Sequence, residues 1–195
     1  ALVRDKRVDN LFLLPAAQTR TKDAVSAEQM EELCAMLRKE FDFIILDSPA
    51  GIESGFRNAA VGADEALVIT TPEVPAVRDA DRIIGLLESM GKSPIRLVIN
   101  RLRGRLVREG EMLDVRDVLD ILAIDLVGIV PEDESVVKSA NRGEPLTFGD
   151  SAPAAHAFQR IASRILGETV PFPDFSEEQG KGFLAGIRKF FGRKE

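Results

Sequence analysis

Short runs of apolar residues alternate along this chain with segments in which apolar residues recur every three or four positions. A continuous apolar run is typical of a strand buried on both faces, and the longer spacing is typical of an amphipathic helix. The pattern predicts strands at Leu11–Leu14, Phe43–Asp47, Ala66–Thr70, Ile95–Asn100 and Leu126–Ile129. It predicts helices at Ala27–Lys39, Ala76–Met90, Val115–Ile124, Glu134–Asn141 and Ala154–Leu166. Gly143 and Gly167 follow the last two helices, where glycine commonly ends a helix.

This alternation predicts an α/β fold, a doubly wound and mostly parallel sheet with helices on both faces. Right-handed crossovers between the strands would bring the loops at Asp47, Thr71, Asn100 and Pro131 to one edge of the sheet. Open α/β sheets bind their ligands at this carboxyl edge, so we expect the ligand site there.

Composition is that of a globular domain, with 195 residues, 45% hydrophobic and 30% charged. We expect an α/β domain over residues 1–170, a linker over 171–180 and a separate helix over 181–195. The single cysteine cannot form an internal disulfide, and no apolar run suits a signal peptide or a membrane span, which favours the cytoplasm. A net charge of −6 argues against extensive nucleic-acid binding.

The segment Phe43–Glu53 carries the strongest chemical signal. Its apolar run ends on Asp47, whose carboxylate would lie at the carboxyl edge and could hold Mg²⁺ or its water. Gly51 has no Cβ, so its N–H can approach a terminal phosphate closely. An ordinary α/β protein can also end a buried strand with Asp and turn with Pro-Ala-Gly, so the segment alone leaves both interpretations open.

Four segments together resemble the MinD branch of the MinD/ParA family of deviant P-loop ATPases, in matching order along the chain. They are FIILDSPAGIE from Phe43, TTPEVPAVRDADRI from Thr70, VINR from Val98 and GIVPEDESVVKSANRGEP from Gly128. The resemblance implies the P-loop NTPase type of α/β fold, with ATP and Mg²⁺ as cofactors.

The resemblance also implies roles for particular residues. Asp47 would serve Mg²⁺, through a water, and Gly51 the terminal phosphate, so both are predicted catalytic positions. Asn100 would contact the adenine base, since an amide both donates and accepts. The remaining predicted nucleotide-binding residues are Arg101, Pro131, Glu132 and Asp133. Without the resemblance, Asn100 is better interpreted as a cap on its strand or turn, and the acids as a helix start.

The function implied is selection of the cell-division site. Such an ATPase dimerises on ATP, binds the inner face of the bacterial cytoplasmic membrane, recruits MinC and is released when MinE stimulates hydrolysis. The implied partner surface consists of Arg78, Asp79, Asp81 and Arg82, although such alternating charges are also typical of a solvated helix face.

No G-x-x-x-x-G-K-[ST] motif occurs in the sequence. Gly85, Gly91, Lys92 and Ser93 come nearest, but they have one residue too many between the glycines and follow a helical pattern. Because the family begins with a strand and this loop, we expect an N-terminally truncated piece that has lost meaningful ATP hydrolysis.

The C-terminal segment 181–195 predicts a basic amphipathic helix with a net charge of +4. Such a helix suits an anionic membrane surface, and the alternative is a helix that docks on the core or on a partner. The predicted membrane-binding residues are Phe183, Leu184, Ile187, Arg188, Lys189, Phe190 and Phe191.

Other interpretations of the whole chain stay open. A flagellar-placement or DNA-partitioning ATPase of the same group is one, although the phenylalanine-rich tail argues against DNA partitioning. A non-enzymatic membrane-interaction module is another. Cys34 has the helical spacing of a core residue, and His156 has no second metal ligand of the usual type nearby, so neither is assigned chemistry.

Overall fold

The computed structural model describes residues 2–15, 25–49, 51–149 and 152–172. They belong to two compact units, Ala1–Ala63 and Asp64–Glu195, which are taken one at a time below. Residues 173–195, which hold most of the predicted linker and the whole predicted tail helix, lie outside the described residues. The domain boundaries expected from the sequence therefore stay a prediction.

The second unit is built on a parallel sheet in the order β3 (Ala66–Thr70), β4 (Ile95–Leu102) and β5 (Asp125–Pro131). These strands confirm three of the predicted apolar runs. Three consecutive residues at the centre of β4, Leu97, Val98 and Ile99, are at most 3% exposed. Burial of neighbouring residues means that β4 is covered on both faces, which is why its sequence is continuously apolar.

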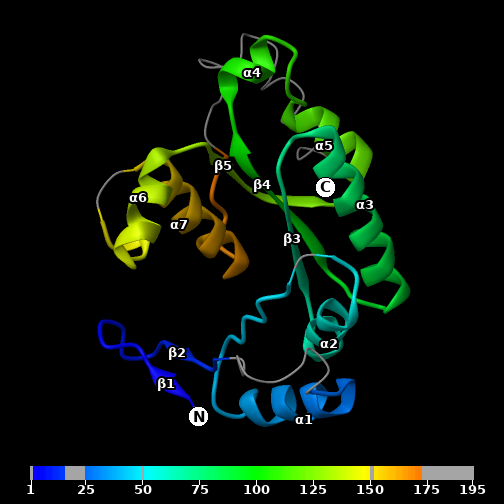
Figure 1. Ribbon diagram of the computed structural model, residues 1–195, viewed down its shortest axis with the longest axis vertical. Coiled ribbons are helices and arrows are strands. Elements are labelled where there is room, and N and C mark those ends of the chain that lie inside the picture. Colours follow the sequence, from blue (N-terminus) through cyan, green and yellow to red (C-terminus); the bar gives the residue numbers. More distant parts are fainter. Residues whose placement is uncertain (1, 16–24, 50, 150–151, 173–195) are drawn as a thin grey trace. The chain divides into compact units, whose positions relative to one another are not determined.

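Helices cover both faces of this sheet (Figure 1). One side carries α3 (Val74–Ser89) and α5 (Val115–Leu122), and the other carries α6 (Glu134–Arg142) and α7 (Pro153–Ile165). The unit also contains the short helices α4 (Gly104–Arg108) and η1 (Leu146–Phe148). The predicted α/β architecture is thus confirmed, with the expected helices ending within two residues of their predicted bounds.

The core between α7 and the sheet is tightly packed. Its buried residues are Val98, Val127, Val130, Ala154, Ala157 and Ile161. Gly128 lets α7 approach β5 closely, because a Cβ built at this position would lie 2.1 Å from Cγ1 of Ile161.

The helix ends follow ordinary capping rules. The Asp114 carboxylate accepts the N–H of Asp117, while the Asp117 carboxylate accepts the N–H of Asp114, which forms a capping box at the start of α5. Gly143 and Gly167 have positive φ angles of 66° and 88° just after α6 and near the end of α7, as predicted. Ala123 takes the same left-handed conformation after α5, with φ of 52°.

The first unit contains a short antiparallel hairpin and two packed helices. These elements are β1 (Val3–Arg4), β2 (Phe12–Leu13), α1 (Ala27–Leu37) and α2 (Ser54–Gly62). A Cβ at Gly62 would lie 2.6 Å from Sγ of Cys34, so this glycine allows α1 and α2 to meet closely. Cys34 is only 1% exposed, which confirms its interpretation as a core residue.

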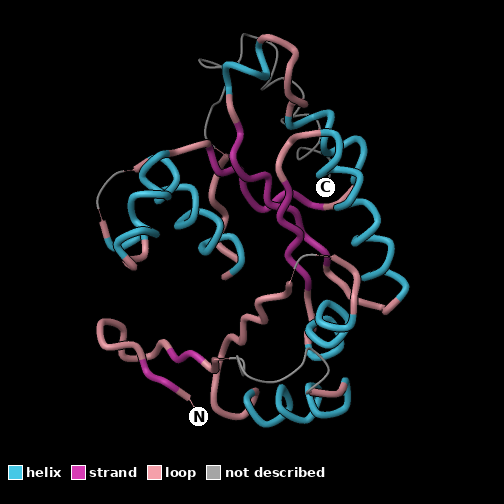
Figure 2. Tube along the Cα trace, in the orientation of Figure 1, coloured by secondary structure: helices cyan, strands magenta, loops and turns pink. Residues whose placement is uncertain are grey.

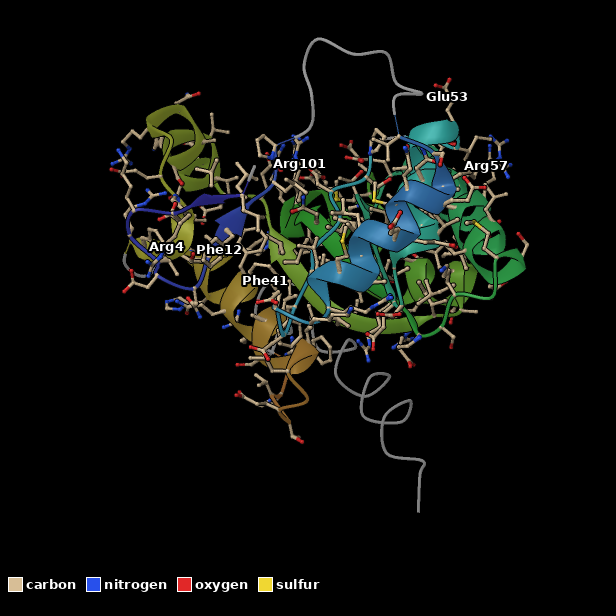
Figure 3. The ribbon with its side chains drawn as sticks, turned by 90° about the horizontal axis from the view of Figure 1, so that it is seen from below. Arg4, Phe12, Phe41, Glu53, Arg57 and Arg101 are labelled. Atoms are coloured by element: carbon tan, nitrogen blue, oxygen red, sulfur yellow. The ribbon has the colours of Figure 1, made fainter. Side chains whose placement is uncertain are left out.

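An aromatic contact joins the hairpin to the segment after α1. The rings of Phe12 and Phe41 lie 5.4 Å apart between centroids, with 65° between their planes (Figure 3). This edge-to-face geometry is favoured by the ring quadrupoles and is worth about 0.5–1.5 kcal/mol beyond burial.

The prediction of a buried strand at Phe43–Asp47 is wrong for this structure. Figure 2 shows the run as loop, and Phe43 and Ile45 are 60% and 93% exposed. A strand needs a neighbour for its backbone hydrogen bonds, and no ladder in the described part of the chain includes this run. High hydrophobicity without a partner strand therefore did not produce a strand.

Candidate nucleotide-binding edge

The carboxyl ends of β3, β4 and β5 define one edge of the sheet in the second unit. The parallel register pairs Thr70 with Ile99, and Leu102 with Pro131. Thr71, Asn100 and Pro131 therefore meet at this edge, as the crossover argument predicted. Asp47 belongs to the first unit, so its place on this edge remains a prediction.

A β-bulge shapes β4 at the predicted base-binding residue. Between the pairs Ile99–Ile129 and Leu102–Pro131, β4 has Asn100 and Arg101 opposite the single residue Val130. Arg101 takes a left-handed φ of 57°, which is uncommon for a residue other than glycine, Asn or Asp. Bulges of this kind often re-aim side chains beside functional sites.

The Asn100 side chain supports the backbone of this bulge. Its Oδ1 accepts the N–H of Arg101 at 3.0 Å, which is the capping role considered from the sequence. Since an amide oxygen has two lone pairs and the Nδ2 group has two donors, hydrogen-bonding capacity remains for a base edge. The capping and base-binding roles are compatible.

Arg101 and Glu132 form a two-point ion pair across β4 and β5. Nε of Arg101 donates to Oε2 of Glu132 at 2.9 Å, and Nη2 donates to Oε1 at 3.4 Å. Nη2 of Arg103 lies 3.6 Å from the same Oε1. The hydrogen bond from Arg101, ahead of its charge, lowers the pKa of Glu132, and the same contact raises the pKa of Arg101.

This ion pair is exposed, so it contributes little to stability, about 0–1 kcal/mol. Arg101 and Glu132 side chains are 58% and 38% exposed. Glu73, the N-cap residue that precedes α3, adds a smaller electrostatic effect that also raises the pKa of Arg101. The arrangement places a fixed guanidinium, an amide and carboxylates at one edge, which suits binding of a polar ligand.

Asp133 stabilises the starts of two helices, of which the sequence indicated only the first. Its Oδ1 accepts the N–H of Ser135 at 2.8 Å and caps α6, and its Oδ2 accepts the N–H of Ala154 at 3.2 Å at the start of α7. The backbone donors of Ser135 and Ala154 hold the pKa of Asp133 below its ordinary value. Asp133 thus joins two helix starts, while its assignment to nucleotide binding stays a prediction.

Two residues at this edge were not among the predicted site residues. Glu73 is the third residue after β3, and Arg103 is the first residue after β4. Their positions after buried strands could have indicated them from the sequence. Their electrostatic interactions with Arg101 and Glu132 are seen only once the strands are paired.

The predicted phosphate and magnesium residues lie in the first unit. Asp47 is exposed in an irregular segment, and Gly51 has a φ of 98° with open space where a Cβ would stand. Among the described residues, no three His, Cys, Asp or Glu side chains gather closely enough to hold a metal ion. The roles of Asp47 and Gly51 stay predictions.

The predicted partner surface lies on α3. Arg78, Asp79, Asp81 and Arg82 are all exposed, and the Arg82–Asp79 ion pair has a distance of 3.7 Å. These contacts are compatible with both a solvated face and a partner surface. His156 is also exposed, with its Nδ1 3.3 Å from Oε1 of Gln159.

Comparison with known proteins agrees with this architecture. Residues 5–146 match the model of the CobQ/CobB/MinD/ParA nucleotide binding domain. Septum site-determining protein MinD of Bacillus subtilis is 52% identical over 194 residues, which is 98% of this chain and 72% of that protein.

Two solved structures extend the comparison. MinD in the MinC:MinD complex of Aquifex aeolicus has a TM-score of 0.82 and 42% identity, over 89% of this chain and 69% of that chain. MinD of Pyrococcus horikoshii, complexed with Mg-ADP, has a TM-score of 0.64 at 22% identity over 83% and 59%, which shows the fold alone.

The parallel sheet, its two helical layers and the polar carboxyl edge define a nucleotide-binding α/β domain of the P-loop NTPase type. Identity with MinD proteins extends over almost the whole chain. The chain belongs to the MinD family of septum site-determining proteins, as the sequence motifs indicated.

Proposed function

We propose that this protein acts in division-site selection as a membrane-associated ATPase of the Min system. It dimerises on ATP, recruits the division inhibitor MinC, and leaves the membrane when MinE stimulates hydrolysis. The observation that carries the proposal is the Asn100–Arg101–Glu132 cluster at the carboxyl edge, in a chain matched by a nucleotide-binding domain over residues 5–146.

The described residues fit a nucleotide at this edge. Asn100 has donors and acceptors for a base edge, and the Arg101–Glu132 pair borders it on the adjoining strands. Mg²⁺ usually takes one or two carboxylates plus phosphate oxygens and waters, and Asp47 of the first unit is the carboxylate proposed for this role. When bound, ATP and Mg²⁺ supply a transferable phosphoryl group and neutralise its charge.

MinC binding is supported by the related Aquifex aeolicus MinD, which was solved in a MinC:MinD complex. The partner surface proposed here is the exposed α3 set of Arg78, Asp79, Asp81 and Arg82. MinE is proposed to use the same surface. Both assignments rest on family membership and on the exposure of these side chains.

Membrane binding is proposed for the segment 181–195. Within the described residues, no helix has both the length and the apolar character required to cross a membrane. Burial of two phenylalanines contributes about 3–6 kcal/mol, whereas a second tail in an ATP-bound dimer would raise avidity by ~10² to 10⁴. Nucleotide-dependent dimerisation would therefore set the time spent on the inner face of the cytoplasmic membrane.

The test is co-sedimentation of the chain with anionic vesicles, with and without Mg·ATP. A variant carrying Phe190→Ser and Phe191→Ser keeps the charge of the tail and removes its apolar anchors. We expect its vesicle partitioning to fall at least ~100-fold, from the lost phenylalanine burial. Unchanged binding by this variant would overturn the membrane assignment.

The nucleotide comparison separates the enzyme from a simple membrane module. The proposed ATP-dependent dimer should bind vesicles more strongly with Mg·ATP, whereas a simple membrane module should bind them equally in both conditions. Equal binding in the two conditions would overturn nucleotide control of membrane binding.

A further inference from the structure

A groove in the second unit lies between the start of α3 and the segment that joins α4 to α5. Its volume is about 860 Å³, which gives room for several side chains. Its accessible apolar wall comprises Val74, Pro75, Val107 and Leu113, backed by the buried Pro72 and Met112. Val74 is 46% exposed although it stands in the first turn of an amphipathic helix.

The rim of this groove is acidic. Four carboxylates line it, those of Glu73, Glu111, Asp114 and Asp117, against the guanidinium groups of Arg108 and Arg116. The capping box holds the Asp114 and Asp117 carboxylates in place at one end. The N–H of Leu113 donates to the carbonyl of Pro72 at 3.1 Å, which fixes one wall against the other. An apolar wall beside acidic side chains suits a basic amphipathic segment.

The chain contains one segment with this chemistry. Residues 181–195 have an apolar stripe of phenylalanine, leucine and isoleucine, flanked by five basic residues and one acidic residue. These residues lie outside the described part of the chain, and the groove belongs to the same unit.

Arg164 fixes the point from which this segment departs. Its Nη1 donates to the carbonyl of Val127 on β5 at 2.8 Å, and its Nε and Nη2 donate to the carbonyls of Val170 and Pro171, each at 2.9 Å. Its guanidinium carbon also lies 3.9 Å from the ring centroid of Phe172. The chain is therefore attached to the sheet up to Phe172.

The intervening chain is long compared with the strands of this unit. Residues 173–180 can span roughly 26–29 Å when extended. The seven-residue strand β5 is about 23 Å long, so even its full length is within this reach. The groove lies beyond the carboxyl end of β3, at Pro72, while the anchor contacts β5 at Val127.

We propose that the basic amphipathic segment 181–195 docks in this groove of its own chain. Phenylalanines occupy the apolar wall, and the lysines and arginines face the acidic rim. The docked segment is unavailable to other surfaces. If the proposed function holds, the groove and the membrane compete for the same apolar residues of the tail. Only this competition depends on the proposed function.

The test is cross-linking in the full chain, which does not require membrane binding. Val74→Cys with Phe191→Cys places one thiol in the groove and one in the tail. The matched control is Val137→Cys with Phe191→Cys, because Val137 is also an exposed helical valine, 62% exposed, on α6 across the sheet. Cys34 is 1% exposed, and the unmodified chain measures its background.

With a short bis-maleimide, we expect at least ten-fold more intramolecular cross-link at Val74 than at Val137. Glu111→Lys in the groove variant should lower that yield several-fold, whereas Glu88→Lys, the same charge change elsewhere on exposed surface, should leave it unchanged. Equal yields at the two valines, or equal effects of the two charge changes, would overturn the proposal. Cross-links only between chains, detected by mixing the two single-cysteine proteins, would overturn docking within one chain.

A vesicle assay separates failure of this inference from failure of the proposed function. If both ideas hold, Glu111→Lys releases the tail and raises the vesicle-bound fraction several-fold over Glu88→Lys. Specific cross-linking without any vesicle binding would support the groove and reject the membrane role. Tail-dependent vesicle binding without specific cross-linking would reject docking in the groove and support the membrane role.

Discussion

Replacement of Gly128 by alanine is expected to destabilise the second unit through a single misplaced methyl group. A Cβ there would lie 2.1 Å from Cγ1 and 2.6 Å from Cδ1 of Ile161, which is 7% exposed. Carbon atoms normally pack at about 3.5–4.0 Å, so at least roughly 1.4 Å must be recovered by movement of Ile161 or α7.

The expected cost of Gly128→Ala follows from overpacking of a filled core. Such insertions cost about 1–3 kcal/mol, and this contact belongs at the upper end because Cγ1 is not the free tip of the side chain. A loss of about 2–3 kcal/mol corresponds to a Tm decrease of roughly 4–12 °C for a chain of this size.

Urea unfolding followed by far-ultraviolet circular dichroism measures the free-energy change, and the m value reports whether compactness has changed. Gly85→Ala is the matched control, because Gly85 stands inside α3 and a Cβ there would meet no atom within 4 Å. This control should gain about 0.5–1 kcal/mol from helix propensity.

A second substitution tests the proposed cause. Ile161→Ala alone should cost about 2–5 kcal/mol by leaving a cavity. Combined with Gly128→Ala it should cost at least ~1 kcal/mol less than the sum, since the new methyl then has space. Native-like stability of Gly128→Ala, or strict additivity in the double variant, would refute the steric reasoning.

Two further predictions concern helix capping and backbone strain. Asp133→Ala should lower stability by about 1 kcal/mol near neutral pH through loss of the α6 cap. Since the pKa of Asp133 is lowered from 3.8, its contribution is present above 3.8 and is lost as pH falls through the folded value, so urea titrations of native and variant protein should converge in acid. Ala123→Gly should raise stability by about 0.5–1 kcal/mol, because glycine adopts the observed φ of 52° without a Cβ penalty, and an unchanged Tm would contradict this account.

Local sequence was sufficient to predict an element where its buried residues recur at a regular spacing. The run Ala66–Thr70 appears as the predicted strand with the same bounds, and Gly143 and Gly167 adopt left-handed backbone at helix ends. Helix α2 was missed, because glycines at both ends of Ser54–Gly62 weaken the local helical signal. Its buried contacts, such as Gly62 against Cys34, are made with a helix that is distant in sequence.

The sequence by itself determined the α/β class, the alternation of strands and helices, and the residue types available at the carboxyl edge. Only tertiary structure decided that Arg101 pairs with Glu132, 31 positions away, and that Asp133 caps α6 while holding the start of α7. It also left the apolar run at Phe43 without strand pairing. Periodicity records whether a residue is buried, whereas hydrogen bonds and ladders depend on which distant groups the fold brings within reach.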